Sequence, residues 1–444
     1  MKHPMVAKRN MRGFPAPAVL ISLVVAGCVG ATASGSASAW PAANLPATTA
    51  PTASPIGRPT SSSVPSRTWT SVQWTALPAS GASGLAAGTS GLAAGTSFQV
   101  FGWSRGYVGF AITPPTISAG PMVVPSYSTD GTHWHNGQTL DPRAAGSQML
   151  FAFRSVIEGA TGLLAVGWSG ACGSEYLDSL WTSSDGISWQ PVDASKVFGA
   201  SPPMIARVSG GAASYVAVAY KSAGVWTSRD GRPWQRVDLG AAAYKNSFVD
   251  DGTAVSGGFV LAGTAGTPDC SGSSADGSSR LISRTAAVWW SADGSSWRRT
   301  TLPGATANDG QSMWIARLGD HLLVALDDVW ATGQRSAWGS KDGQTWTPIG
   351  FPKDVSQRDI VSDGQHNLVF QPTQDALGLD PTKLRTIDDA FDLVTVGQSG
   401  DLPQFGNSTA SGSSYGLVAL GPTGIVATNG DGSRLWLGKP SSGS

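Results

Sequence analysis

Short apolar or alternating runs separated by turn residues recur along most of this chain. The pattern is clearest between Met204 and Val237, where the runs M-I-A-R-V, Y-V-A-V-A-Y, V-W-T-S and W-Q-R-V are divided by Gly-rich or polar turns. Runs of this length, bounded by turn residues, are typical of antiparallel strands. This stretch therefore predicts one unit of four strands.

The turn before the last run carries a motif that repeats along the chain. In the third unit it reads W-T-S-R-D-G-R-P-W and ends at Trp234. Weaker matches extend the series, L-R-T-I-D ending at Asp388 and S-R-L-W-L-G ending at Gly438. Repeated four-stranded units predict an all-β chain folded as a seven-bladed β-propeller, with six or eight blades as the alternatives. Five strong copies align on the aspartates Asp130, Asp185, Asp230, Asp293 and Asp342.

The seventh unit has three predicted strands, which leaves its blade one strand short. They are Tyr415–Leu420, Gly424–Thr428 and Arg434–Leu437. The segment S-V-Q-W-T-A-L-P, which begins at Ser71, resembles the last strand of the fourth unit. We expect this N-terminal strand to complete the last blade and close the ring, because an unpaired sheet edge is then avoided.

The composition agrees with strands joined by tight turns. Of the 444 residues 57 are glycine, and Glu158 and Glu175 are the only glutamates among 29 acidic residues. Aspartate suits turns and disfavours the interior of helices. The formal net charge is zero, which gives no electrostatic reason to expect binding to nucleic acid or to an anionic membrane surface.

The N-terminal residues read as an export signal followed by a tether. Basic residues precede an apolar run from Phe14 to Gly27, which is too short to span a membrane. The run ends in V-A-G-C at Cys28, which resembles a bacterial lipoprotein signal and implies a lipid on that cysteine. The alternative is a secretory signal cut after Ala39. We therefore predict a signal peptide over 1–27, an Ala/Ser/Thr/Pro-rich tether over 28–67 and the propeller over 68–444, with the protein exported and held at the outer face of the cell membrane, or secreted.

The repeated S-x-D-G-x-x-W motif resembles the Asp-box, or BNR, repeat of sialidase-like propellers. The pattern of that family is S-x-D-x-G-x-x-W, so the turn here is one residue shorter. The resemblance covers most of the chain from about residue 68. It implies that the motifs lie at the outer edge of the blades and that the five aspartates are structural.

The same resemblance implies which groups a sialidase would need: three arginines that clamp a carboxylate, a tyrosine paired with a glutamate, and an aspartate acid. Arg154, Arg207 and Arg317 lie at or near predicted first strands, which line the channel of a propeller. The F/Y-R-I-P motif of the family is absent, and F-R-S-V from Phe153 is its nearest match. No tyrosine and glutamate are visibly paired, so we predict no catalytic residue.

Long segments gather between the second and third predicted strands of several units, and they should share one face of the ring. A rigid ring with long loops on one face is suited to binding. The alternative is that these residues finish their strands and pack, or form solvated turns. The residues proposed for a ligand face are Trp168, Tyr220, Lys221, Asp327 and Trp330.

Cys172 and Cys270 fall in two of these segments. Whether these cysteines form a disulfide or remain two free thiols is left open.

His133 and His135 flank Trp134 without a third ligand, and no nucleotide-binding or nucleophile-elbow motif occurs, so we expect no metal and no cofactor. The predicted function is a lipid-anchored, non-catalytic binding or scaffolding module for a protein, peptide or glycan, and the alternative is a sialidase-like glycoside hydrolase.

Overall fold

The computed structural model divides the chain into two units, Met1–Ser62 and Ser63–Ser444. Every residue described below belongs to the second unit, so the predicted signal peptide, Cys28 and the tether up to residue 67 lie outside the described residues. The described residues are 69–77, 97–113, 120–145, 152–159, 161–171, 174–193, 197–198, 205–211, 214–219, 224–237, 247–255, 257–269, 280–294, 296–304, 312–318, 321–327, 336–351, 355, 357, 360–362, 367–372, 379–388, 390–403, 417–429 and 434–441.

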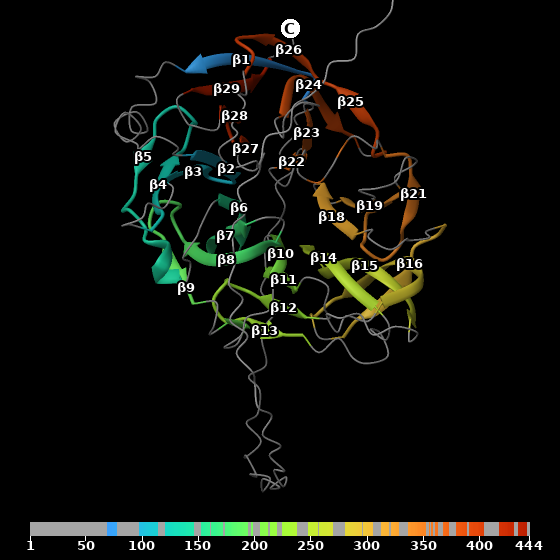
Figure 1. Ribbon diagram of the computed structural model, residues 1–444. Coiled ribbons are helices and arrows are strands. Elements are labelled where there is room, and N and C mark those ends of the chain that lie inside the picture. The colour runs from blue at the N-terminus through green and yellow to red at the C-terminus, as the bar shows by residue number, and fades with distance from the viewer. Residues whose placement is uncertain are drawn as a thin grey trace, which may run out of the picture. The chain divides into compact units, whose positions relative to one another are not determined.

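The second unit is a seven-bladed β-propeller, which confirms the predicted fold class and blade count. Its strands form seven sheets, and in the first six blades the order of strands in the sheet follows the order in the chain. Figure 1 shows the first strand of each blade around the centre and the last strands at the rim. Besides the strands there is one short 3₁₀ helix, η1 (Pro142–Ala145), in the described chain between blades 1 and 2.

The first six blades occupy the chain from Ser97 to Thr395. Blade 1 contains β2 (Ser97–Trp103), β3 (Gly106–Thr113), β4 (Met122–Ser128) and β5 (His135–Asn136), blade 2 contains β6 (Ala152–Gly159), β7 (Gly162–Ala171), β8 (Ser174–Ser183) and β9 (Gln190–Val192), and blade 3 contains β10 (Ile205–Gly211), β11 (Ser214–Ala219), β12 (Val225–Ser228) and β13 (Gln235–Arg236). Blade 4 contains β14 (Ser247–Val255), β15 (Gly258–Asp269), β16 (Arg280–Ser291) and β17 (Arg298–Thr301), blade 5 contains β18 (Ser312–Leu318), β19 (His321–Asp327), β20 (Ala337–Ser340) and β21 (Thr347–Ile349), and blade 6 contains β22 (Ile360–Ser362), β23 (Asn367–Pro372), β24 (Leu379–Ile387) and β25 (Leu393–Thr395).

Blade 7 combines strands from distant parts of the chain. Its first three strands are β27 (Val418–Gly421), β28 (Gly424–Thr428) and β29 (Leu435–Pro440). The fourth is β1 (Ser71–Leu77), which pairs antiparallel with β29 from Val72↔Pro440 to Leu77↔Leu435. A fifth strand that the sequence did not predict, β26 (Gly397–Gly400), pairs parallel with the outer edge of β1.

The core is divided among the interfaces between blades. The described residues contain seven clusters of buried apolar side chains, one at each interface, and each cluster joins strands of two neighbouring blades. The cluster between blades 7 and 1, for example, joins Val426 and Leu437 to Phe98 and Tyr107. Because apolar burial is the main driving force for folding, each blade is stable only when it packs on its neighbours.

Two faces of the ring follow from this topology. In an antiparallel four-stranded blade, the turns between strands one and two and between strands three and four lie at the same end, and the connection between strands two and three lies at the other. We call the first end the turn face and the second the arm face. Since β1 is a fourth strand, it begins at the turn face, so the chain preceding Trp69 joins the ring there.

Candidate functional site

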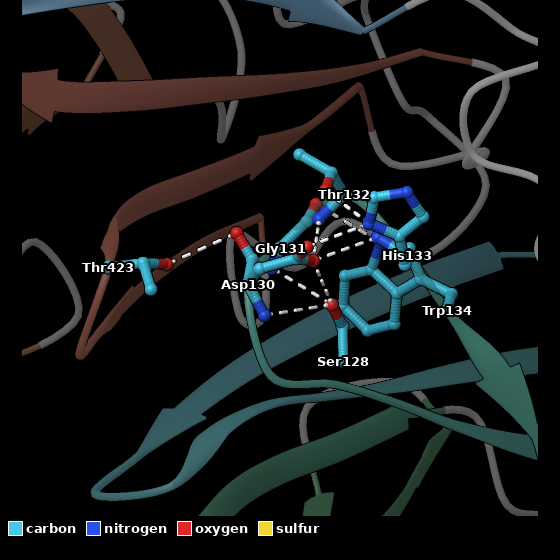
Figure 2. A network of polar contacts seen from close by, with 7 residues as sticks. All are labelled: Ser128, Asp130, Gly131, Thr132, His133, Trp134 and Thr423. Atoms are coloured by element: carbon cyan, nitrogen blue, oxygen red, sulfur yellow. Dashed lines mark hydrogen bonds and ion pairs between the residues drawn. The ribbon is translucent and has the colours of Figure 1, made fainter.

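The Asp-Gly turns lie on the turn face and are held by their own side chains. In blade 1, Ser128 Oγ accepts the N–H of Gly131 at 2.8 Å, and Asp130 Oδ1 accepts the N–H groups of Thr132 and His133 at 2.7 and 2.9 Å. Trp134 Nε1 donates to the carbonyl of Gly131 at 3.2 Å. Figure 2 shows these contacts in one view. The tryptophan after each turn therefore closes the turn from which it emerges.

The same arrangement recurs in the first five blades. The serine oxygen accepts the glycine N–H at 2.8 to 2.9 Å, and the tryptophan Nε1 donates to the glycine carbonyl at 2.8 to 3.2 Å, in all five Asp-Gly turns. Each glycine has a φ between 70° and 80°, the left-handed region that favours glycine. Serine, aspartate, glycine and tryptophan thus each make a separate contact within the turn.

Partial burial raises the pKa of Asp130, but hydrogen bonds from the backbone and side chain of His133 and from Thr132 outweigh it, so the pKa lies well below its ordinary value. The pKa values of Asp185 and Asp342 are lowered for the same reason, against the same effect of burial. A carboxylate that accepts several N–H bonds is held in its charged form. These aspartates are therefore anions at neutral pH, engaged within their turns.

Each Asp-Gly turn also packs on the preceding blade. A Cβ atom at Gly131 would lie 2.6 Å from Val426 Cγ2 of blade 7, and one at Gly343 would lie 2.7 Å from Val260 Cγ2 of blade 4. Thr423, in the turn between β27 and β28, donates its hydroxyl to the carbonyl of Asp130 at 3.1 Å (Figure 2). The turns therefore fasten neighbouring blades together.

The tryptophan before the turn makes a similar contact between blades. Trp181, Trp226, Trp289 and Trp338 are buried, and each belongs to the apolar cluster shared with the preceding blade. In blade 6 the turn differs, because Phe391 takes the place of a left-handed glycine with a φ of 66°. Its ring packs at 5.6 Å from that of His321 in blade 5, so this turn is also fastened to the preceding blade.

The channel-lining strands of blades 2, 3 and 4 share a feature that the sequence did not predict. The pairing of each first strand with the second shifts at equivalent positions, between Phe153 and Ser155, between Ile205 and Arg207, and between Val249 and Asp251. Bulges of this kind re-aim side chains and are common next to functional sites. The residues left out of the pairing are Arg154, Ala206 and Asp250. Arg207 follows Ala206 and pairs with Val218, so Arg154 and Arg207 lie one position apart on adjacent first strands.

The third predicted channel arginine lies at another level. Arg317 pairs with Leu322, which is the first pair after the one that closes the turn between β18 and β19. In blades 2 and 3 the bulge comes four pairs after the pair that closes the corresponding turn. Three residues of a strand span roughly 10 Å. The backbone register therefore separates Arg317 from the other two, and Arg154 and Arg317 are half-buried and each has an interaction partner.

The acidic groups next to the bulge in β14 join blade 4 to blade 5. Asp250 Oδ2 accepts the N–H of Met313 at 3.0 Å, and the fully buried Asp251 accepts the N–H of Ile315 at 3.0 Å. The amide of Gln357 donates to Asp251 Oδ2 at 3.2 Å. These carboxylates replace the backbone acceptors that a neighbouring strand would supply, so both have a structural contact.

A tyrosine and a glutamate do lie near each other, at the turn face. Both carboxylate oxygens of Glu158 accept hydrogen bonds from Ser104, one from the backbone N–H and one from the hydroxyl. Tyr215 donates its hydroxyl to the carbonyl of Gly162 at 3.2 Å. Burial first, and then the charges of Glu158 and Asp230, raise the pKa of Tyr215, which is the opposite of what an activated nucleophile needs.

The arm face carries paired strand extensions rather than simple loops. In blades 2, 4 and 6 the second and third strands continue to pair beyond the start of the first strand, after a bulge in each case. We call these extensions the arms; their strand segments are 169–171 with 174–176, 267–269 with 280–282, and 371–372 with 379–380. In these three blades, the long segments predicted between the second and third strands are therefore partly strands.

The predicted ligand residues fall on this face in part. Trp168 lies in β7 at the base of the blade 2 arm, and Asp327 ends β19. Tyr220, Lys221 and Trp330 lie outside the described residues, as do Cys172 and Cys270. Cys172 directly follows β7 and Cys270 directly follows β15, so each cysteine belongs to the chain that joins the strands of an arm.

The histidines that flank Trp134 do not point to a metal centre. His133 Nδ1 lies 2.7 Å from Asp130 Oδ2 at the exposed surface of the turn. Among the described residues no three His, Cys, Asp or Glu side chains come together in a way that could hold a metal ion. Within the same residues no helix has the length and apolar character needed to cross a membrane.

Comparison with known proteins gives fold similarity of low score. No family model and no curated protein matches the chain. Among solved structures, the chain is similar to the six-bladed fucose-binding lectin of Aleuria aurantia, with 10% identity over 70% of this chain and 98% of that one and a TM-score of 0.34. It is similar to a glycosyl hydrolase from Bacteroides ovatus, with 10% identity over 52% and 80% and a TM-score of 0.28, and to the Bacteroides ovatus xyloglucan PUL GH43B protein, with 11% identity over 69% and 57% and a TM-score of 0.30. These scores are too low to support a function.

Proposed function

We propose that this protein is a lipid-anchored, extracytoplasmic propeller that binds a protein, peptide or glycan on its arm face without catalysis. The observation that carries the proposal is the set of arms in blades 2, 4 and 6, which rise from one end of a rigid ring. Binding surfaces are commonly built from segments that a rigid scaffold positions. The Asp-Gly turns, which we interpret as short Asp-boxes, occupy the opposite end and fasten the blades.

The attachment point of the chain suits this arrangement. The chain preceding Trp69 joins the ring at the turn face, and a lipid on Cys28 would therefore hold the ring from that side. The arm face would then carry no attachment to the membrane and would be free to meet soluble or surface-bound partners. A tether rich in Ala, Ser, Thr and Pro gives the ring reach but little fixed orientation.

The absence of catalysis is supported by how the described acidic and phenolic groups are used. Glu158 is bound by Ser104, Tyr215 has a raised pKa, and Asp251 is fully buried with backbone and amide donors. A glycosidase needs two carboxylates that face the scissile bond. The competing hypothesis, a sialidase-like glycoside hydrolase, draws on Arg154 and Arg207, which lie at or next to bulges in neighbouring channel-lining strands.

The two functions are separated by incubating the detergent-purified full chain with cell-envelope extract and with a panel of fluorogenic sialosides and glycosides. We expect capture of a specific envelope component and no turnover. If turnover occurs and is lost in Arg154→Met and in Arg207→Met, the protein is a hydrolase and not a binding module. The control is Arg236→Met, at the exposed outer strand of blade 3, which should keep that turnover.

Anchoring is tested separately by labelling cells with a fatty-acid analogue. The wild-type chain should carry the label and stay in the membrane fraction, and Cys28→Ala should lose the label. A Cys28→Ala protein that keeps the label would refute the anchor.

We also propose a disulfide between Cys172 and Cys270, which would join the arms of blades 2 and 4. Peptide mapping without reduction should give the cross-linked pair, and two alkylated thiols would exclude the disulfide.

A further inference from the structure

An arginine at the base of the blade 4 arm has a donor that no protein group accepts. The guanidinium of Arg284 lies over the ring of Phe248, with 5.3 Å between Cζ and the ring centroid. The side chain is half-buried, and its Nε is buried without a hydrogen-bond partner. A buried donor without an acceptor is costly, and native proteins contain few of them.

A second unused polar group lies on the same side of this sheet. Thr264 is fully buried, and its hydroxyl has no hydrogen-bond partner. Thr264 stands opposite Phe248 on one side and opposite Ala286 on the other. Since residues that are paired in an antiparallel sheet point to the same face, the hydroxyl lies on the face where Arg284 crosses the ring of Phe248.

The fold places Arg284 where the blade 4 arm leaves the sheet, close to the channel-lining strand. Phe248 is the second residue of β14, the channel-lining strand, and Arg284 lies in the bulge from which the arm leaves the sheet. The nearby acidic side chain on β14, Asp250, is engaged by the N–H of Met313 at 3.0 Å. Arg284 therefore lies at the inner base of an arm, and its charge has no ion-pair partner among the described residues.

The geometry of the guanidinium selects the chemistry. Arginine donates two parallel N–H bonds to the two oxygens of a planar carboxylate, and an aromatic ring beneath the guanidinium fixes its plane. Nε is one of the two donors on the side edge of the guanidinium, which is one of the edges used in such a fork. A single arginine supplies one positive charge, which matches a carboxylate better than a doubly charged phosphate.

We propose that Arg284, supported by Phe248, is a subsite for a carboxylate group of the ligand that the arm face binds. The proposal rests on the function proposed above and adds the chemical class that is recognised. An acidic sugar or the C-terminus of a peptide could supply the carboxylate. The ligand would bind with its carboxylate at the base of the blade 4 arm and the rest of its length along the arm face.

The test measures affinity for matched acidic and neutral probes by titration with the full chain in detergent. The probes are glucuronate against glucose, and N-acetyl-diglycine against its amide. We expect the acidic member of at least one pair to bind at least tenfold more tightly, with the effective pair identifying the source of the carboxylate. Equal binding of both members in both pairs would overturn the proposal.

Three variants locate the effect. Arg284→Gln should abolish the preference for the acidic probe, and Arg236→Gln, which removes an exposed arginine from β13, should preserve it. Arg284→Met should abolish the preference while leaving the urea unfolding midpoint unchanged or higher, because it replaces an unpartnered buried donor with an apolar chain. A lower midpoint together with an unchanged preference would show that the arginine is structural.

The failure of this inference can be told from the failure of the proposed function. If Arg284→Gln captures the envelope component as the wild type does and the acidic preference is unchanged, the carboxylate subsite is wrong and the binding module stands. If the wild type neither captures a component nor prefers an acidic probe, both are wrong.

Discussion

The Asp-Gly turns and the base of the blade 4 arm use polar side chains in opposite ways. On the turn face, serine, aspartate and tryptophan complete their hydrogen bonds within one turn, and the glycine packs on the preceding blade. At the base of the blade 4 arm, a strand pair extends beyond the sheet, and Arg284 and Thr264 have buried groups without partners. Saturated contacts stabilise a fold, whereas unused donors remain available for a ligand. The difference supports our proposal that the Asp-Gly turns stabilise the ring and that the arm face recognises a ligand.

The strongest way to break this comparison is to remove a tryptophan that fastens two blades. Trp289 is fully buried between blades 3 and 4. Trp289→Ala should lower the free energy of unfolding by about 3–5 kcal/mol, because the cavity cannot be filled. Guanidinium unfolding followed by tryptophan fluorescence measures the loss. Val394→Ala, at an exposed position of blade 6, serves as the control and should change it by less than about 0.5 kcal/mol.

A smaller loss should follow from breaking the carboxylate contact between blades 4 and 5. Asp251→Ala leaves the N–H of Ile315 without its acceptor, so the free energy of unfolding should fall by about 1–3 kcal/mol. Asp251→Asn keeps an oxygen acceptor, so its free energy of unfolding should fall less than that of the alanine variant. Equal stability of the alanine variant and the wild type, measured by urea unfolding, would mean that Asp251 does not join the blades.

The Asp-Gly turns should make stability depend on pH in one direction. The lowered pKa of Asp342 means that its carboxylate stabilises the fold at pH values above the ordinary aspartate pKa of about 3.9, and that this contribution is lost as the pH falls toward the lowered pKa. The wild type should therefore have a higher free energy of unfolding than Asp342→Asn near neutral pH, and this difference should decrease between about pH 5 and pH 2. Unfolding midpoints at several pH values measure it, and an advantage that grows on acidification would contradict the assignment.

Shortening an arm should have the smallest effect on stability. Replacing residues 268–281 with Asn-Gly leaves the Thr267↔Ile282 pair to close a two-residue hairpin. The described pairs that are removed, Pro268↔Leu281 and Asp269↔Arg280, join two strands. Under reducing conditions, where the proposed Cys172–Cys270 disulfide is absent from both proteins, the free energy of unfolding should therefore change by less than about 1 kcal/mol. A loss as large as that of Trp289→Ala would show that the arms also hold the ring together.

The sequence is informative where local chemistry determines the structure. The D-G turns with their tryptophans fix the third and fourth strands of the blades, and the similarity of Ser71–Pro78 to another fourth strand identifies β1 as part of the last blade. In contrast, the arms of blades 2 and 4 pass through stretches rich in Gly and Ser, where neither period nor propensity predicts a strand. Pairing across the hairpin forms them, and that is a tertiary effect.

The candidate site was less predictable than the fold. Arg154, Arg207 and Arg317 all lie in first strands, but their levels in the channel depend on the register and bulges of pairing with the second strand, which the sequence does not show. Arg284 carries no motif and follows a Ser-rich stretch, so nothing in the sequence connects it with Phe248. If β16 is read as a strand whose side chains alternate between two faces, Arg284 is expected on the same face as Ala286. This alternation was the signal in the sequence that could have placed Arg284.

The central claim, that the turn face holds the ring while the arm face binds, is tested most directly by envelope capture with the chain in which residues 268–281 are replaced by Asn-Gly. Under reducing conditions, the account predicts an unfolding midpoint close to that of the wild type together with at least a tenfold loss of captured ligand. Capture equal to that of the wild type by this stably folded variant would contradict it.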